Sequence, residues 1–151
     1  SAFGTVRGLF LGAPVKSQIA FQSFRDGRFD AYVMNTDGSR QHRLTAKPNV
    51  LFPVWSPDGR KIVYAQGWPD NPDLYVMNTD GSGLRRLTRG PASDGGPLWS
   101  PGGRKIAFTK AHAPAVSREP SDSDVYVIIV NVCGDRAFPI YAVGGWPVWS
   151  R

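Results

Sequence analysis

The sequence predicts an all-β fold built from small antiparallel sheets that repeat along the chain. Composition is the first reason: 41% of the 151 residues are hydrophobic, with 17 Gly, 13 Pro, 8 Phe, 5 Tyr and 5 Trp. Such a mixture suits short strands joined by tight turns better than long helices. The second reason is a set of sequence elements that return about every 44 residues.

The repeat is read most clearly from two elements. Residues 32–39 recur unchanged at 75–82, a shift of 43. Residues 53–62 return at 97–106, a shift of 44, with two changes, Leu98 for Val54 and Gly102 for Asp58. The same element begins a third time at 147–150. Three units are therefore present.

Each unit is expected to form four strands separated by turns that Pro, Asn, Asp and Gly favour. For the second unit, the predicted segments are a strand ending at Trp55, a turn at 56–59, strands at 61–65 and 73–78, a turn at 78–81, and a strand at 84–88. Four antiparallel strands in about 44 residues is the pattern of one blade of a β-propeller, whose repeat is usually about 40–45 residues.

The predicted division of the chain is a single three-blade unit. Blade 1 covers about residues 6–45, blade 2 about 52–88 and blade 3 about 96–142, while 146–151 begin a further blade or supply a closing strand. Blade 3 contains a longer loop, predicted at 111–124, which is either mobile or a partner contact.

These motifs resemble the TolB-like propeller repeat. The resemblance rests on the apolar strand at 62–64, the hairpin at 73–82, the Leu-Thr pair, and the Pro-x-Trp-Ser-Pro-Asp-Gly element at 53–59. It covers residues 17–110 closely and 122–151 loosely. It implies a six-bladed ring, of which this chain supplies three blades, and an extracytoplasmic, periplasmic setting. The resemblance does not fix function, because such propellers serve as partner-binding modules, peptidase gates and lyase scaffolds.

Three tryptophans occupy one repeat position, and we expect them to form structural core between blades: Trp55, Trp99 and Trp149. Asp37, Asp58 and Asp80 lie in the predicted turns, where a carboxylate accepts hydrogen bonds from nearby backbone N–H groups. They lack the ligand spacing of a calcium loop.

The candidate partner-binding residues lie at the predicted channel rim and in loops. Asn49 and Asp94 fall near the position where the family pattern places a polar residue beside the central channel. Trp68 and Trp146 lie outside the common tryptophan position and either cap the packing or stack on a carbohydrate. His112 lies in the long loop of blade 3.

Several classes of function are not expected. Cys133 is the only cysteine, so the chain alone forms no disulfide and no cysteine-based zinc site. His42 and His112 stand in no recognisable catalytic motif, and we predict no catalytic, metal-binding or cofactor-binding residue. The net charge of +6 is diffuse, with arginines mostly in turns and at strand ends, so nucleic acid is not expected as a partner. Without a run of about 20 apolar residues, membrane insertion is not expected either.

The sequence therefore predicts a non-catalytic binding or scaffold module that uses propeller loops and the central channel to hold a protein or peptide. The alternatives are a carbohydrate-binding or sugar-cleaving propeller, and a fragment of a larger propeller protein. Three blades leave apolar faces open, so a homodimer that closes one six-bladed ring is expected.

Overall fold

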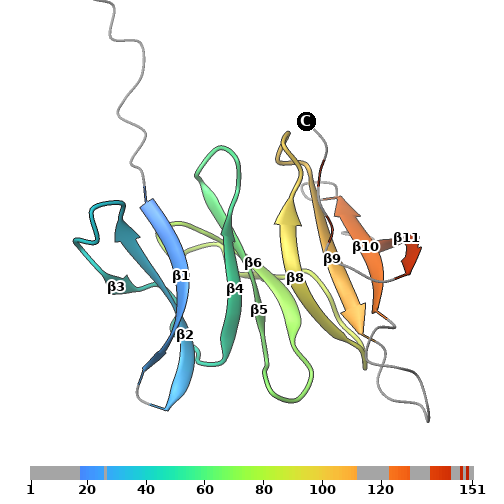
Figure 1. Ribbon diagram of the computed structural model, residues 1–151, viewed down its shortest axis with the longest axis horizontal. Helices are drawn as coiled ribbons and strands as arrows, with labels where there is room; N and C mark the ends of the chain where they lie inside the picture. The colour runs from blue at the N-terminus through green and yellow to red at the C-terminus, as the bar shows by residue number, and fades with distance from the viewer. Residues whose placement is uncertain are drawn as a thin grey trace, which may run out of the picture.

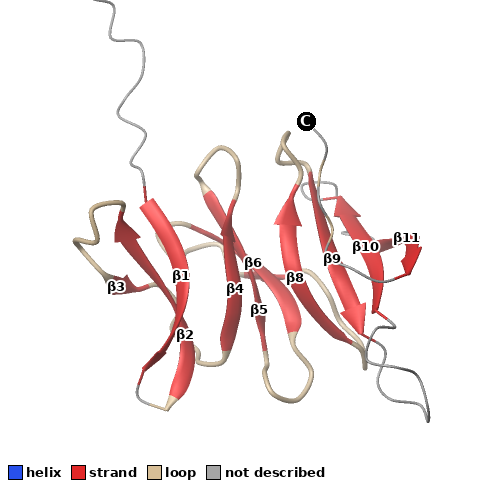
Figure 2. Cartoon of the chain, in the orientation of Figure 1, coloured by secondary structure: helices blue, strands red, loops and turns tan. Residues whose placement is uncertain are grey.

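A computed structural model describes residues 18–25, 27–111, 123–129, 137–143, 147 and 149. These residues form strands, turns and loops and contain no helix, which confirms the all-β prediction. The strands make three antiparallel sheets that lie side by side along the long axis of the molecule (Figure 1; Figure 2).

The three sheets follow one another along the chain. The first consists of β1 (Gln18–Arg25), β2 (Arg28–Asn35) and β3 (His42–Arg43), in that spatial order. The second consists of β4 (Val50–Trp55), β5 (Lys61–Gln66), β6 (Asp73–Asn78) and β7 (Arg85–Arg86), also in chain order. The third consists of β8 (Ser93–Trp99), β9 (Lys105–Ala111), β10 (Ser123–Ile129) and β11 (Ala137–Val143). We call β4 and β8 the opening strands, because each begins its sheet.

The turns that follow the opening strands form as their residues predict. Gly59 adopts φ +67 and donates its N–H to the carbonyl of Ser56 at 2.9 Å. Residues with a side chain rarely adopt a positive φ, which explains why glycine stands at this position. The second predicted turn closes in the same way, with the N–H of Gly81 bonded to the carbonyl of Asn78 at 2.9 Å.

The opening strands share one irregularity. Pairing of β4 with β5 jumps from Leu51 to Val54, and pairing of β8 with β9 jumps from Gly95 to Leu98. Each jump is a β-bulge, which bends the strand and increases its twist. The bulges contain Phe52 at φ 55 and Gly96 at φ 56, each followed by a proline that has no N–H to donate.

The middle sheet is buried on both faces. On β5, Ile62 and Tyr64 belong to a cluster that includes Ala31 and Val33 of the first sheet. Their neighbours Val63 and Ala65 point the other way, into a cluster with Trp99, Ile106 and Phe108 of the third sheet. Successive side chains of a strand alternate between faces. Two-sided burial therefore explains why this strand is apolar at consecutive positions.

The long loop of the third unit is shorter than the sequence predicted. Ala111 pairs with Ser123 and Lys110 with Asp124, so both ends of the predicted loop belong to strands. The remaining residues 112–122, and residues 1–17 with the predicted first strand of blade 1, lie outside the described residues. The proposed blade boundaries stay a prediction.

Candidate functional site

The sheets present two kinds of ends. At one, which we call the rim end, the opening strands begin, and residues 44–49, 67–72 and 87–92 connect the strands. At the other, which we call the turn end, lie residues 36–41, 56–60, 79–84 and 100–104. The predicted partner-binding residues Asn49, Trp68 and Asp94 all belong to the rim end.

Backbone hydrogen bonds join neighbouring sheets at the rim end. Asn49 donates its N–H to the carbonyl of Phe29 at 2.7 Å, and Asp94 donates its N–H to the carbonyl of Pro72 at 2.7 Å. Asn49 is half-buried with φ 64, and its carbonyl accepts from the N–H of Gly67. The backbone of the predicted rim residues is therefore fixed by contacts to the preceding sheet.

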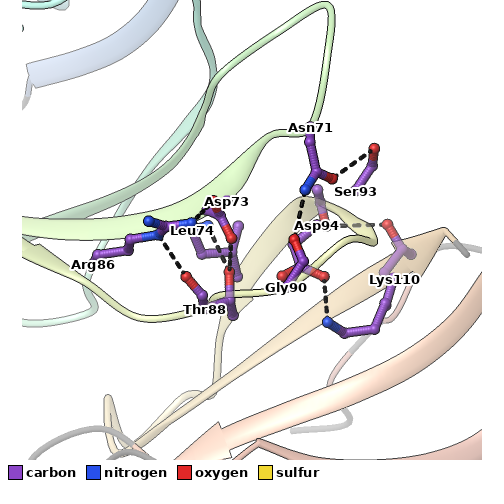
Figure 3. A network of polar contacts seen from close by, with 11 residues as sticks. Asn71, Asp73, Leu74, Arg86, Thr88, Gly90, Ser93, Asp94 and Lys110 are labelled. Atoms are coloured by element: carbon purple, nitrogen blue, oxygen red, sulfur yellow. Dashed lines mark hydrogen bonds and ion pairs between the residues drawn. The ribbon is translucent and has the colours of Figure 1, made fainter. Parts of the chain in front are cut away.

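The Asp94 side chain is buried instead of lying on an open surface. It is 0% exposed, and its Oδ1 lies 3.0 Å from Nζ of Lys110, its partner on β9 (Figure 3). Burial raises the pKa of the Asp94 carboxyl. Hydrogen bonds from Thr88 and Lys110, together with the positive charge of Lys110, lower this pKa and offset part of the rise. The negative charge of Asp73 raises it further. The assignment of Asp94 to the channel rim stays a prediction, and among the described residues its carboxylate is held in a buried ion pair.

A second buried carboxylate lies beside it. Asp73 begins β6 and forms an ion pair with Arg86 of β7 (Figure 3). Thr88 accepts a hydrogen bond from the N–H of Leu74 at 2.9 Å, while Arg86 Nε donates to the carbonyl of Thr88 at 2.9 Å. These contacts tie the short outermost strand β7 to β6.

The first sheet repeats part of this arrangement. Asp30 is buried and lies within 3.5 Å of both Arg28 and Arg43, and Thr45 accepts from the N–H of Ala31. Asp30, Arg43 and Thr45 correspond to Asp73, Arg86 and Thr88 at the shift of 43. That recurrence was the sequence signal for these contacts between an Asp, an Arg and a Thr, and the prediction from sequence did not include them. Arg43 and Arg86 each end a two-residue strand and pair with a buried carboxylate.

Further polar contacts hold the connection between the second and third sheets. Asn71 Nδ2 donates to the carbonyl of Gly90 at 2.6 Å, and Ser93 Oγ donates to Asn71 Oδ1 at 3.4 Å (Figure 3). Asn71 therefore couples the β5–β6 connection to the segment that precedes β8.

Of the candidate residues predicted in loops, Trp68, Trp146 and His112, only Trp68 lies within the described residues. Trp68 is 48% exposed, in the six-residue connection 67–72 between β5 and β6. Trp146 and His112 lie outside the described residues. The structure thus brings Asn49, Trp68 and Asp94 to the rim end, and it offers only the first two at least partly to solvent.

The three equivalent tryptophans mark the joins between sheets. Trp99 is 6% exposed and donates Nε1–H to the carbonyl of Val54 in the neighbouring opening strand at 3.3 Å. Trp149 is half-buried and donates to the carbonyl of Leu98 at 3.2 Å, one sheet later. Trp55 is half-buried against the cluster shared with the first sheet, and its Nε1 has no hydrogen-bond partner among the described residues.

The described part of the chain lacks two features that would point to other classes of function. No group of three or more His, Cys, Asp or Glu side chains is placed to hold a metal ion there. That same part contains no helix of the length and apolarity needed to cross a membrane.

Replacing Lys110 with Met tests the buried ion pair at the rim end. At neutral pH we expect a loss of about 3–5 kcal/mol in the free energy of unfolding, because the Asp94 carboxylate is left buried without its cation. A raised folded-state pKa favours the folded state while the carboxyl is protonated, and this stability is lost as pH rises through that pKa. The cost should therefore shrink on acidification, measured by urea unfolding across the acid range.

Lys105→Met is the matched control, since Lys105 is an exposed residue of the same strand. Equal effects of the two replacements at every pH would show that Lys110 does not neutralise Asp94.

Comparison with known proteins agrees with this geometry. The family model of the TolB beta propeller domain matches residues 12–120. A candidate TolB from Agrobacterium tumefaciens has a similar structure, with a TM-score of 0.68 and 26% sequence identity over 85% of this chain and 48% of that one. TolB from Acinetobacter baumannii gives a TM-score of 0.65 and 20% identity over 87% of this chain and 32% of that one.

An oligogalacturonate lyase in complex with manganese shares the fold at a TM-score of 0.56 and 14% identity, over 76% of this chain and 31% of the lyase. The comparison with curated proteins found no match. The chain spans about half the length of the Agrobacterium protein and about a third of the Acinetobacter protein. The three sheets are thus β-propeller blades, and the chain belongs to the TolB-like β-propeller family.

Proposed function

We propose that this chain is a non-catalytic binding module whose rim end, together with the channel beside the opening strands, holds a protein or peptide partner. The main support is a contrast between the two ends. At the turn end, Asp37, Asp58 and Asp80 are engaged in their own turns. At the rim end the connections differ between units: two residues separate β1 from β2, whereas residues 67–72 separate β5 from β6. Loops that vary on a rigid scaffold are where binding specificity is usually found.

The ring itself is the second part of the proposal. Propellers generally close with four to eight blades, and the described residues supply three sheets. In the second sheet, β5 pairs with the opening strand β4, whereas its equivalent in the first sheet, β1, has no opening strand beside it among those residues. Among the same residues, Trp55 Nε1 has no hydrogen-bond acceptor, although Trp99 and Trp149 each have one. We propose that a second copy supplies the missing neighbour, so that a homodimer closes a six-bladed ring. The family resemblance also supports a location outside the cytoplasm.

The alternative function is binding or cleavage of a carbohydrate. Two observations favour it: Trp68 offers an exposed aromatic face of the kind that stacks on sugar rings, and the oligogalacturonate lyase shares the fold. Removing Trp68 affects both functions, so the ligand distinguishes them.

Selection of a displayed peptide library on the purified protein tests partner binding. We expect peptides whose affinity falls at least tenfold in Trp68→Ala and in Asn49→Gly, which removes the side chain but tolerates the positive φ. Leu84→Ala is the control, because Leu84 is exposed at the turn end. Equal loss in the control, or binding or turnover of oligogalacturonides that depends on Trp68, would contradict a peptide-binding role.

Light scattering at low micromolar concentration tests ring closure. The expected mass is that of two 16.5 kDa chains, and deletion of residues 146–151 should yield a single-chain species, because residues 147–149 repeat the last three residues of the opening strand β4. A stable 16.5 kDa species that the deletion leaves unchanged would rule out closure by this pairing.

A further inference from the structure

The second and third sheets carry a matched pair of turns at the turn end. Residues 56–61 and 100–105 have the same backbone: Gly59 and Gly103 adopt φ 67 and φ 66. In both turns a serine hydroxyl accepts the N–H of a lysine, from Lys61 to Ser56 at 2.9 Å and from Lys105 to Ser100 at 3.1 Å. One difference stands out, because Asp58 in the first turn is Gly102 in the second.

The first turn is organised around the Asp58 carboxylate. Its Oδ1 accepts the hydroxyl of Ser56 at 2.6 Å and the N–H of Arg60 at 3.1 Å. The hydrogen bond from Ser56, followed by that from the Arg60 N–H, lowers the pKa of this carboxyl, so the turn favours the charged form. These two donors and one shared oxygen define a small carboxylate-binding unit.

The second turn keeps the donors and lacks the carboxylate. Among the described residues, Ser100 Oγ and the N–H of Arg104 have no side-chain acceptor. A Cβ placed on Gly102 would meet no atom within 4 Å, so the space that the Asp58 side chain occupies in its own turn is open here. Gly102 does not adopt a positive φ, and the backbone therefore does not require glycine at this position.

The open space belongs to a groove between the two turns. Its walls include Lys61, Trp99, Pro101, Gly102 and Arg104. Asp58 also lines it, with one carboxylate oxygen already engaged by Ser56 and the Arg60 N–H. Arg104 is exposed and makes no ion pair with any described residue. The amino group of Lys61 lies 3.0 Å from the amide oxygen of Asn78, which holds its positive charge at the groove. Lys61 and Arg104 thus bring two cations to a groove in which the first turn supplies one carboxylate and the second turn supplies none.

We propose that this groove binds a carboxylate of a peptide, which completes the second turn in the way that Asp58 completes the first. The bound oxygen accepts the Ser100 hydroxyl and the Arg104 N–H, and the Arg104 guanidinium adds a charge-assisted contact. Trp99 and Pro101 offer apolar surface to the rest of the ligand. The site is at the end opposite the proposed partner-binding rim, and it does not depend on that function.

The carboxylate has two sources, the side chain of Asp or Glu and the carboxyl terminus of a chain. Three peptides separate them: acetyl-Gly-Asp-Gly-amide, acetyl-Gly-Gly-Gly with a free carboxyl terminus, and acetyl-Gly-Asn-Gly-amide as the uncharged control. Acetate serves as the minimal probe and phosphate as an anion of different geometry.

Nuclear magnetic resonance of the 15N-labelled protein measures binding directly. We expect acetate and at least one carboxylate peptide to shift the Arg104 amide resonance in a saturable manner, while the Arg60 amide, already capped by Asp58, stays in place. Absence of any saturable shift at Arg104, an equal response to the Asn peptide, or a response to phosphate alone would overturn the proposal.

The matched variants exchange the two turns. Gly102→Asp should fill the site from within the chain, abolish the response of Arg104 to acetate and raise the melting temperature. Asp58→Gly should make the Arg60 amide respond to acetate. If Asp58→Gly does not fold, Gly102→Asp still decides, because a response to acetate that persists in that variant would contradict the proposed position of the carboxylate.

Discussion

The contact of the Trp99 indole with the neighbouring opening strand is the constraint on which the rest of the structure depends. Its ring is buried between the second and third sheets, and its Nε1–H donates to the carbonyl of Val54. Trp149 repeats the same bond one sheet later, to Leu98. Each acceptor is the residue immediately before the next tryptophan of the series, Val54 before Trp55 and Leu98 before Trp99. The same part of an opening strand therefore accepts a hydrogen bond from the following tryptophan and carries the tryptophan that packs toward the preceding sheet. The proline and the bulge that precede Trp55 and Trp99 bend the strand where this contact is made.

Once the sheets are fixed in this way, equivalent polar residues hold the short outer strand in each of the first two sheets. Asp73, Arg86 and Thr88 hold the short outer strand of the second sheet, and Asp30, Arg43 and Thr45 do the same in the first. Buried carboxylates are tolerated because each has a cation within reach. The residues that repeat most faithfully therefore serve the fold, and we propose that a partner binds at the positions where the units differ.

Much of the fold could be predicted from the sequence, because local chemistry repeats with it. The bounds of β6 agree with the predicted strand at 73–78, and β4 ends at Trp55 as expected. The outer strand was predicted at 84–88 but spans Arg85–Arg86, because Thr88 bonds the Leu74 N–H through its side chain instead of extending the ladder. The turn aspartates were identified correctly, since their partners lie only two residues away.

The site could be predicted less well, because it depends on pairs that are distant in sequence. Asp94 was recognised as a special position, but its burial against Lys110 follows from the register of β8 with β9, which composition does not reveal. The missing carboxylate at Gly102 emerges only when two turns of known backbone are compared. Family membership leaves both matters open, since a shared fold does not specify what its variable positions bind.

Unfolding of Trp99→Ala by urea, compared with Trp68→Ala, is the most direct test of the central role of the inter-sheet tryptophan. The account predicts a loss of about 3–5 kcal/mol for the buried Trp99, because a large cavity opens between two sheets and the Val54 carbonyl loses its donor. Trp68, at 48% exposed, should lose far less. Equal and small effects of the two replacements would contradict the claim that this indole joins the sheets.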